Sequence, residues 1–135
     1  MANITTLIFV ESRYKVNRKR MKAVVKRVLS SNDAETNLEI SLAVVGDRKM
    51  KALNSKYRGK DETTNVLSFP LSEGVQTKLP SSYSSGGEGI THLGDIVISY
   101  PVVIREASRD DMLVDEKVEQ LVEHGLNHLL GIHHE

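Results

Sequence analysis

Apolar positions along the chain alternate in short segments and recur every three or four residues in longer ones, which predicts strands and helices in turn. The predicted strands are rich in β-branched residues and cover residues 4–10, 38–46, 63–70 and 95–99. The predicted helices each have one apolar stripe and cover residues 17–30, 47–57, 101–108 and 115–130. Strands separated by helices indicate an α/β (α+β) fold, with one small mixed four-stranded sheet packed with about four helices in a single domain over residues 1–135.

Polar residues and glycine mark the ends of several predicted helices. Asn17, Asp47 and Asp115 each stand before a helical pattern, where a side-chain oxygen can accept hydrogen bonds from the first turn. Gly131 follows the last apolar position and suits the left-handed conformation that ends many helices. Residues 71–91 are rich in serine and glycine and show no sustained period, so we expect a long loop there.

The composition limits the cellular setting and the kind of metal site. No apolar run approaches the roughly 20 residues that a membrane-spanning helix needs, and the N-terminal residues lack the basic region and cleavage site of a signal peptide. The chain contains no cysteine, so any metal must be held by nitrogen and oxygen ligands. We therefore expect a cytoplasmic protein without a membrane partner.

A net charge of zero conceals two oppositely charged halves. Residues 1–60 contain fourteen Lys and Arg against five Asp and Glu, whereas residues 61–135 contain four against thirteen. The cations gather in residues 13–27 and 48–60. Such asymmetry favours an anionic partner for the basic half, although the same lysines could simply form solvated helix faces.

Four of the five histidines lie in the last twelve residues, HGLNHLLGIHHE. His124 and His128 are four apart and so share one face of the predicted helix, where both imidazoles can reach one metal ion. Gly131 would let the chain reverse after the helix, and His134 could then supply a third nitrogen. Three protein ligands leave a fourth position for water, which is typical of catalytic metal sites. The alternative is a solvated terminal segment whose histidines bind nothing.

The same spacing occurs in the zinc-peptidase signature HExxHxxGxxH, but one position differs. Gly125 stands where those peptidases carry the glutamate that acts as general base. Glu123, the neighbouring carboxylate, would point about 200° away around the helix. Without a base in register, peptide hydrolysis loses its proton acceptor. We expect Gly125 to provide close packing, or room for a substrate, instead.

Three segments of the sequence resemble the YbeY family, the single-strand-specific endoribonucleases that act in ribosomal RNA maturation. HGLNHLLGIHH (124–134) is similar to the family's H-G-x-L-H-L-L-G-Y-D-H. YRGKDETTNVLSFP (57–70) resembles Y-R-G-K-D-x-P-T-[ND]-V-L-S-F-P, and LGDIVIS (93–99) resembles L-G-D-I-x-I-S. The three segments occur in the family's order and make up about a quarter of the chain.

The chain departs from the family pattern near the last histidine. Asn127 replaces an apolar residue, and Ile132 and His133 replace a tyrosine and an aspartate. His133 therefore competes with His134 as the third ligand, although the register favours His134. Family members usually continue beyond the position of Glu135, so we expect the third ligand to lie on a terminus prone to disorder.

The resemblance implies how such a site would cleave RNA. The three spaced histidines would hold one divalent metal ion, with zinc the first candidate, and the metal would lower the pKa of bound water and polarise a phosphate oxygen. Arg58, the arginine of the YRGKD segment, would stabilise charge on the phosphate, because its planar fork suits phosphate better than a lysine does. On residue type alone, a surface ion pair with Asp61 or Glu62 is the simpler interpretation of Arg58.

Two further polar residues of the matching segments are candidates for supporting the site. Asp95 could accept a hydrogen bond from a ligand imidazole, and Asn65 could support the wall of the site. Either residue could instead fix a turn or a strand end. His92 lies just before the predicted fourth strand, and we expect it to be a loop residue and not a further metal ligand.

The resemblance implies a metal-dependent, single-strand-specific endoribonuclease that acts in ribosomal RNA maturation and ribosome quality control, and the three spaced histidines agree with it. Basic residues of the first half would follow the RNA backbone: Arg18, Lys19, Arg20, Lys22 and Lys60. Ribosomal proteins or the small ribosomal subunit are the further partners that the resemblance implies. Two alternatives are a metallohydrolase of another substrate and a catalytically weak ribosome-associated binding module, which the changes at Ile132 and His133 would favour.

Overall fold

The computed structural model of the chain describes residues 3–30, 37–71 and 90–131. Within these residues it contains four strands and four helices, which confirms the predicted fold class. The strands are β1 (Ile4–Val10), β2 (Asn37–Val45), β3 (Val66–Pro70) and β4 (Ile90–Ser99). The helices are α1 (Arg18–Ser30), α2 (Asp47–Arg58), α3 (Tyr100–Arg109) and α4 (Val114–Leu129).

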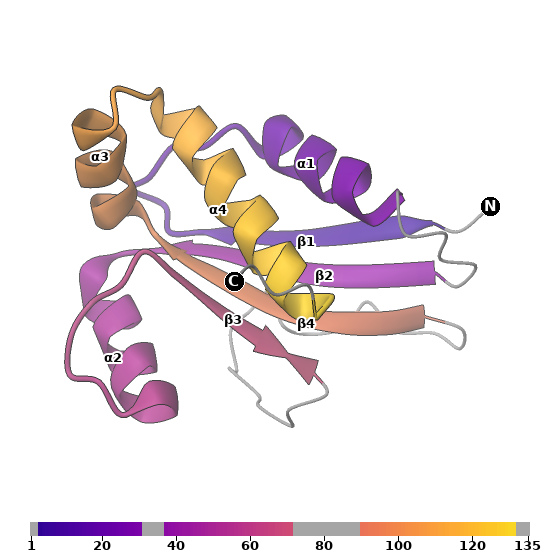
Figure 1. Cartoon of the computed structure of the whole chain (residues 1–135), viewed down its shortest axis with the longest axis horizontal. Coiled ribbons are helices and arrows are strands. Elements are labelled where there is room, and N and C mark those ends of the chain that lie inside the picture. The colour runs from indigo at the N-terminus through magenta and orange to yellow at the C-terminus, as the bar shows by residue number, and fades with distance from the viewer. Residues whose placement is uncertain (1–2, 31–36, 72–89, 132–135) are drawn as a thin grey trace.

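One mixed sheet in the order β1-β2-β4-β3 forms the centre of the protein. β1 runs parallel to β2 and β2 parallel to β4, whereas β3 pairs with β4 in the antiparallel direction and forms one edge. Figure 1 shows α1, α3 and α4 on one face of this sheet and α2 on the other. Among the residues that the structure describes, no helix is long and apolar enough to cross a membrane.

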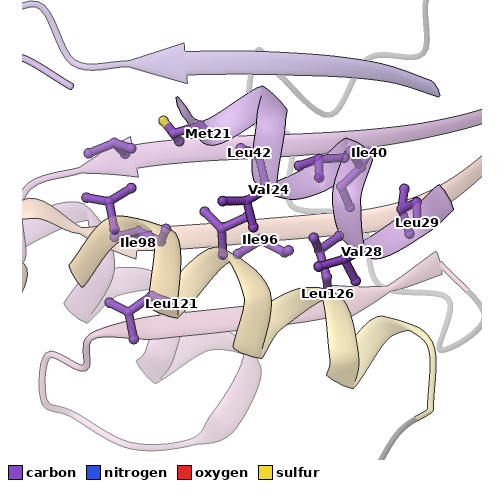
Figure 2. Packing of buried hydrophobic residues seen from close by; sticks show 14 of the residues in the cluster. Met21, Val24, Val28, Leu29, Ile40, Leu42, Ile96, Ile98, Leu121 and Leu126 are labelled. Carbon is purple, nitrogen blue, oxygen red and sulfur yellow. The ribbon is translucent and has the colours of Figure 1, made fainter. Parts of the chain in front are cut away.

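Strand alternation sends side chains into two separate apolar layers. On the three-helix face, Ile40 of β2 and Ile96 of β4 pack with Val24 of α1 and Leu126 of α4, as Figure 2 shows. On the other face, a smaller layer lies against α2 and contains Ala43, Val45, Met50, Leu53, Leu67, Phe69 and Val97. β2 is buried on both sides, which explains why its second half reads as a continuous apolar run.

The predicted helix caps are confirmed at one of three helices. Asn17 Oδ1 accepts a hydrogen bond at 3.1 Å from a backbone N–H in the first turn of α1. The predictions for Asp47 and Asp115 are wrong, because both residues already lie inside their helices. The capping positions are Gly46 and Leu113, neither of which carries a side-chain oxygen.

The carboxylate of Asp47 ties the start of α2 to two neighbouring segments. It accepts hydrogen bonds from Ser99 Oγ at 3.0 Å and Thr63 Oγ1 at 3.1 Å, and it lies 3.6 Å from the guanidinium of Arg105. Thr63 is therefore part of the connection between α2 and β3. This contact explains why β3 begins at Val66 and not at residue 63 as predicted.

β4 begins five residues earlier than the apolar pattern predicted, at Ile90 instead of residue 95. Its register with β2 shifts between Glu39 and Ser41, and Gly94 within it has a φ of 148°. This irregularity interrupts the alternation of apolar and polar residues that would have indicated a strand. The predicted loop over residues 71–91 lies mostly outside the described residues, and its last two residues belong to β4.

Candidate functional site

Two histidines share the flank of α4 that turns away from α1. Glu119, on the opposite flank, forms an ion pair with Arg20 of α1. Counting 100° per residue, His124 and His128 lie about 140° to 180° around the helix from Glu119. His124 is exposed and His128 is half-buried. The helix that the sequence predicted therefore presents two accessible imidazoles on one face, one turn apart.

The end of α4 turns as the sequence predicted. Gly131 has a φ of 76°, in the left-handed region, and its N–H donates to the carbonyl oxygen of His128 at 3.1 Å. His133 and His134, the competing candidates for a third ligand, lie outside the described residues. Within residues 3–30, 37–71 and 90–131, no three His, Cys, Asp or Glu side chains gather closely enough to hold a metal ion. The described part of the chain thus supplies two of the predicted donors.

Gly125, between the two histidines, lies against the sheet. A Cβ at this position would lie 2.9 to 3.0 Å from three side-chain atoms of Ile96, which is fully buried in β4. The expectation of close packing is therefore confirmed. A glutamate at position 125 would point into the core and could not reach a substrate. This geometry argues against the peptidase alternative, because the general base of that chemistry has no room here.

Replacing Gly125 by alanine tests this packing. We expect Gly125→Ala to lower the free energy of unfolding by about 1–3 kcal/mol, the usual cost of overpacking a core, despite the gain of up to about 1 kcal/mol in helix propensity. Urea unfolding followed by circular dichroism measures the change. Adding Ile96→Val removes one of the crowded atoms and should recover part of the loss. A Gly125→Ala variant as stable as the parent chain would show that α4 is free to shift.

A second glycine holds the end of α4 near the edge strand. A Cβ on Gly94 of β4 would overlap the carbonyl oxygen of Phe69 and come within 3.0 Å of Pro70 in β3 and of Leu129 in α4. The last turn of α4 therefore rests directly on the paired ends of β3 and β4. His128, next to Leu129, stands beside this edge of the sheet.

Arg58 lies at the same edge strand, reached from the other face of the sheet. Gly59 adopts a left-handed conformation with a φ of 69° and ends α2, so Arg58 is the last helical residue. Its Nη2 donates to the carbonyl oxygen of Ser68 in β3 at 3.1 Å, and its guanidinium lies 6.0 Å from the centre of the Phe69 ring. The side chain is thus held in one place by contacts along β3.

The alternative interpretation of Arg58, an ion pair with Asp61 or Glu62, is not observed in the described part of the chain. Asp61 instead lies 3.8 Å from the ammonium group of Lys51, and no carboxylate among the described residues pairs with Arg58. A hollow of about 210 Å³ opens beside the guanidinium, between the end of α2 and the start of β3. Its lining residues are Asn54, Arg58, Lys60, Glu62, Thr63, Thr64 and Leu67.

The backbone of β3 shows how Arg58 and the histidine helix are related. The carbonyl oxygen of Asn65 points toward β4 and accepts a hydrogen bond from the N–H of Ser99. Because carbonyl groups alternate in direction along an antiparallel strand, the carbonyl of Ser68, three residues later, points away from β4 to the free edge of the sheet. Arg58 donates at this free edge. α4 packs against β3 from the face of the sheet opposite α2. The helix that carries His124 and His128 and the guanidinium of Arg58 therefore adjoin the same edge strand.

His92 is part of a polar cluster that the sequence did not reveal. It lies in β4, not in a loop as predicted, with Nδ1 2.9 Å from Glu39 Oε1 and Nε2 3.3 Å from Asp95 Oδ1. The hydrogen bond to Asp95, followed by that to Glu39, raises the pKa of His92 above its ordinary value. Asp95 pairs with Phe69 across β3 and β4, so the two side chains lie on the same face of the sheet. The supporting role of Asp95 toward a ligand imidazole stays a prediction.

Asn65 belongs to a network at the other end of β3. Its side-chain N–H donates to Glu106 of α3 at 3.0 Å, and Glu106 lies 3.7 Å from the buried ammonium group of Lys117. Lys117 also donates to Asp110 at 3.0 Å, and hydrogen bonds from Arg109 and Lys117 lower the pKa of Asp110. This network joins β3, α3 and α4. The predicted role of Asn65 as a wall of the site stays a prediction.

The basic residues predicted to contact RNA divide into two groups. Arg18 donates to the carbonyl oxygen of Ile8 at 3.0 Å, and Arg20 forms its ion pair with Glu119. These two cations are therefore already engaged within the protein. The other three predicted cations, Lys19, Lys22 and Lys60, are exposed and form neither an ion pair nor a side-chain hydrogen bond among the described residues. The last of these lines the hollow beside Arg58.

Known proteins resemble this chain over nearly its whole length. The family described as Endoribonuclease YbeY matches residues 7–135. Its relatives named endoribonuclease YbeY include a protein of Magnetococcus marinus, 40% identical over 98 residues that make up 73% of this chain and 65% of the relative. A protein of Syntrophus aciditrophicus is 35% identical over 125 residues, which is 93% of this chain and 72% of the relative.

This chain spans only part of the length of several relatives. The chain spans 65% of the Magnetococcus marinus protein and only 44% of an Anaeromyxobacter relative that is 44% identical over 97 residues and 72% of this chain. The solution structure of a protein from Thermotoga maritima has a similar fold, with a TM-score of 0.57, 21% identity, and coverage of 98% of this chain and 75% of that one. Because the family match includes both the histidine helix and the Arg58 turn, this chain belongs to the YbeY endoribonuclease family.

Proposed function

We propose that this protein is a metal-dependent endoribonuclease that cleaves single-stranded RNA and acts in the maturation and quality control of ribosomal RNA. The observation that carries the proposal is the placement of two accessible imidazoles and a held guanidinium at one exposed strand, in a chain that matches the family over residues 7–135. Ribosomal RNA, with ribosomal proteins or the small ribosomal subunit as further partners, is the setting that the family resemblance implies.

The donor set on α4 fits a single divalent metal ion. His124 and His128 offer two imidazole nitrogens one turn apart on an accessible flank, and imidazole is a preferred ligand of zinc. His134, which follows the left-handed turn at Gly131, is the third ligand in the proposal. When bound, such an ion supplies a Lewis acid that polarises a phosphoryl oxygen.

Arg58 is the proposed catalytic cation. A guanidinium carries five N–H donors in a planar fork, and among the described residues one of them donates to the carbonyl of Ser68. Arg58 lines the hollow beside the strand, where a guanidinium fork can bind two oxygens of one phosphate. Because contacts with Ser68 and Phe69 hold the side chain before substrate arrives, little reorganisation is needed as negative charge builds up in the transition state.

Aromatic residues contribute little to recognition in this proposal. The chain has four tyrosines and two phenylalanines, and Phe69 is buried in the core. Proteins usually bind the individual bases of a single strand by stacking them on aromatic rings. We therefore expect cleavage with weak base preference, directed by the backbone contacts and by the structure of the RNA.

Incubation of metal-loaded protein with an end-labelled single-stranded RNA tests the proposed function. We expect internal cleavage of the single strand, loss of cleavage with a chelator, and sparing of the same RNA annealed to its complement. Peptides and small phosphodiesters serve as comparison substrates. Binding of RNA without cleavage would favour the ribosome-associated binding module, and hydrolysis of another substrate with RNA left intact would contradict the proposal.

The salt dependence of RNA binding tests the α1 surface. Each phosphate neutralised in a single strand adds about −0.7 to the slope of log K against log salt. The double variant Lys19→Gln/Lys22→Gln should therefore reduce the magnitude of the slope by up to about 1.4. Arg105→Gln/Arg109→Gln is the matched control, since these exposed cations already face Asp47 and Asp110. An unchanged slope in the lysine variant would make α1 a solvated face.

A further inference from the structure

We propose that a cationic pocket at the carboxyl ends of β1 and β2, formed by Arg13, Arg48 and Lys49, binds a phosphate group. The pocket is distinct from the site on α4 and β3. Its ligand chemistry has two sources, the backbone of a polynucleotide and free inorganic phosphate. The first source rests on the proposed function, whereas binding of inorganic phosphate does not depend on it.

The topology of the sheet places this pocket where two neighbouring strands lead to helices on opposite faces. After β1 the chain passes to α1 on one face of the sheet, and after the neighbouring strand β2 it passes to α2 on the other, as Figure 1 shows. Adjacent parallel strands whose helices leave to opposite faces open a crevice at their carboxyl ends, and ligands of open α/β sheets bind in such crevices. The β1–β2 pair is a switch point of this kind.

A hollow of about 290 Å³ occupies this position. It is lined by Glu11, Arg13, Arg48, Lys49 and Ala52. Glu11 is the one carboxylate among these residues, and both of its oxygens are engaged, Oε2 by the N–H of Gly46 at 2.8 Å and Oε1 by Arg13 Nη2 at 3.2 Å. Three cations against one carboxylate leave a surplus of two positive charges, which an anion would balance.

Two direct contacts place Arg13 at the pocket. Its guanidinium pairs with Glu11 and lies 4.9 Å from the centre of the Tyr14 ring. The Tyr14 ring in turn stacks on Tyr100 of α3, with ring centres 4.6 Å apart and planes at 29°. A donor that is fixed before binding loses less conformational entropy when a ligand arrives.

Gly46 provides the space for Arg13. Its φ of −85° and ψ of 175° are extended values that any residue adopts, so the backbone conformation does not require glycine. A Cβ at this position would nevertheless come within 2.8 Å of Tyr14 Oη and closer still to Arg13 Nη2. Both atoms are at the ends of flexible side chains and could move aside. The absent side chain therefore lets the guanidinium lie directly over the start of α2.

Arg48 and Lys49 add charge that the protein does not neutralise in its described part. Both side chains are exposed, and no carboxylate of the described residues forms an ion pair with either. The nearest acid along the chain, Asp47, instead accepts from Ser99 and Thr63. Two guanidinium forks and an ammonium group around one hollow suit a tetrahedral anion with several acceptor oxygens, because each fork can bind two oxygens.

NMR titration of the isotope-labelled full chain with inorganic phosphate tests the pocket directly. We expect the backbone amides of Gly46, Arg48 and Lys49 to shift together. Arg13→Gln and Arg48→Gln should each weaken phosphate binding about tenfold or more, since each removes a charged hydrogen bond. Gly46→Ala should weaken it as well, by displacing Arg13 without removing a charge.

Lys51→Gln is the matched control, because Lys51 is a cation of the same helix that does not line the hollow and lies 3.8 Å from Asp61. It should keep the phosphate affinity. Equal weakening by Lys51→Gln and Arg48→Gln, or amide shifts spread evenly over all basic surfaces, would overturn the proposal, because general charge attraction would then explain the binding.

A second arm identifies the source of the phosphate. If the RNA backbone is the ligand, the pocket variants should weaken binding of a long single-stranded RNA and leave cleavage of a dinucleotide unchanged, because the pocket lies away from the end of α4. If RNA binding is unchanged while phosphate binding falls, the pocket takes free phosphate. Absence of RNA cleavage in the unmodified protein, with phosphate still bound, would reject the proposed function and keep the pocket.

Discussion

Arg58→Ala should lower the rate of RNA cleavage by about 10²–10³ while metal content and melting temperature stay near those of the unmodified chain. This factor is what loss of one preorganised donor typically costs when charge develops in the transition state. The guanidinium is preorganised by its hydrogen bond to Ser68 and its place against Phe69. Single-turnover cleavage with saturating protein measures the chemical step apart from RNA binding.

The small effect on stability follows from where Arg58 binds. It donates to a carbonyl at the free edge of β3, where water can replace it. The variant should therefore lose about 1 kcal/mol or less of its free energy of unfolding. Arg58→Lys should restore only part of the rate, because a point charge lacks the bidentate fork. Lys51→Ala, which removes another exposed cation of α2, is the control for general charge loss. Normal cleavage by Arg58→Ala would make the residue a surface charge.

The fold could be predicted because apolar spacing decides which faces are buried. The stripe of α4 and the continuous apolar run of β2 both appear as expected. The boundaries were less predictable where a single polar contact sets them. β3 begins late because Thr63 binds Asp47, and β4 begins early because pairing with β2 continues through the irregularity at Gly94. Neither contact has a local signature in the sequence.

The candidate site divides in the same way. A helix converts the spacing of His124 and His128 into a shared face, so their relation follows from the sequence alone. The partner of Arg58 could not be predicted from the sequence, because Arg58 binds the backbone carbonyl of Ser68. A sequence does not indicate which carbonyl groups lie at a free edge. The contacts of His92 were missed for a related reason: Glu39 is 53 residues away and meets it only through strand pairing.

His128→Ala should abolish stoichiometric binding of a divalent metal and, with it, cleavage of RNA. The residue supplies one of the two described nitrogen donors on α4, and loss of a direct ligand should exceed the 10–100-fold that loss of a supporting residue typically costs in metal affinity. Folding should be unaffected, because His128 is only half-buried and alanine is the better helix former. Metal content by mass spectrometry of purified, dialysed protein gives a readout that does not depend on activity.

Two comparisons decide whether α4 holds the metal. His92→Gln removes a histidine on β4 and should leave the metal content unchanged, since Glu39 and Asp95 engage its ring nitrogens. The double variant His124→Ala/His128→Ala removes both described donors, and full metal occupancy in that protein would place the metal elsewhere. Replacement of His133 or His134 one at a time then identifies the third ligand, because only the residue that binds the ion should release it when changed. The register of the sequence predicts His134.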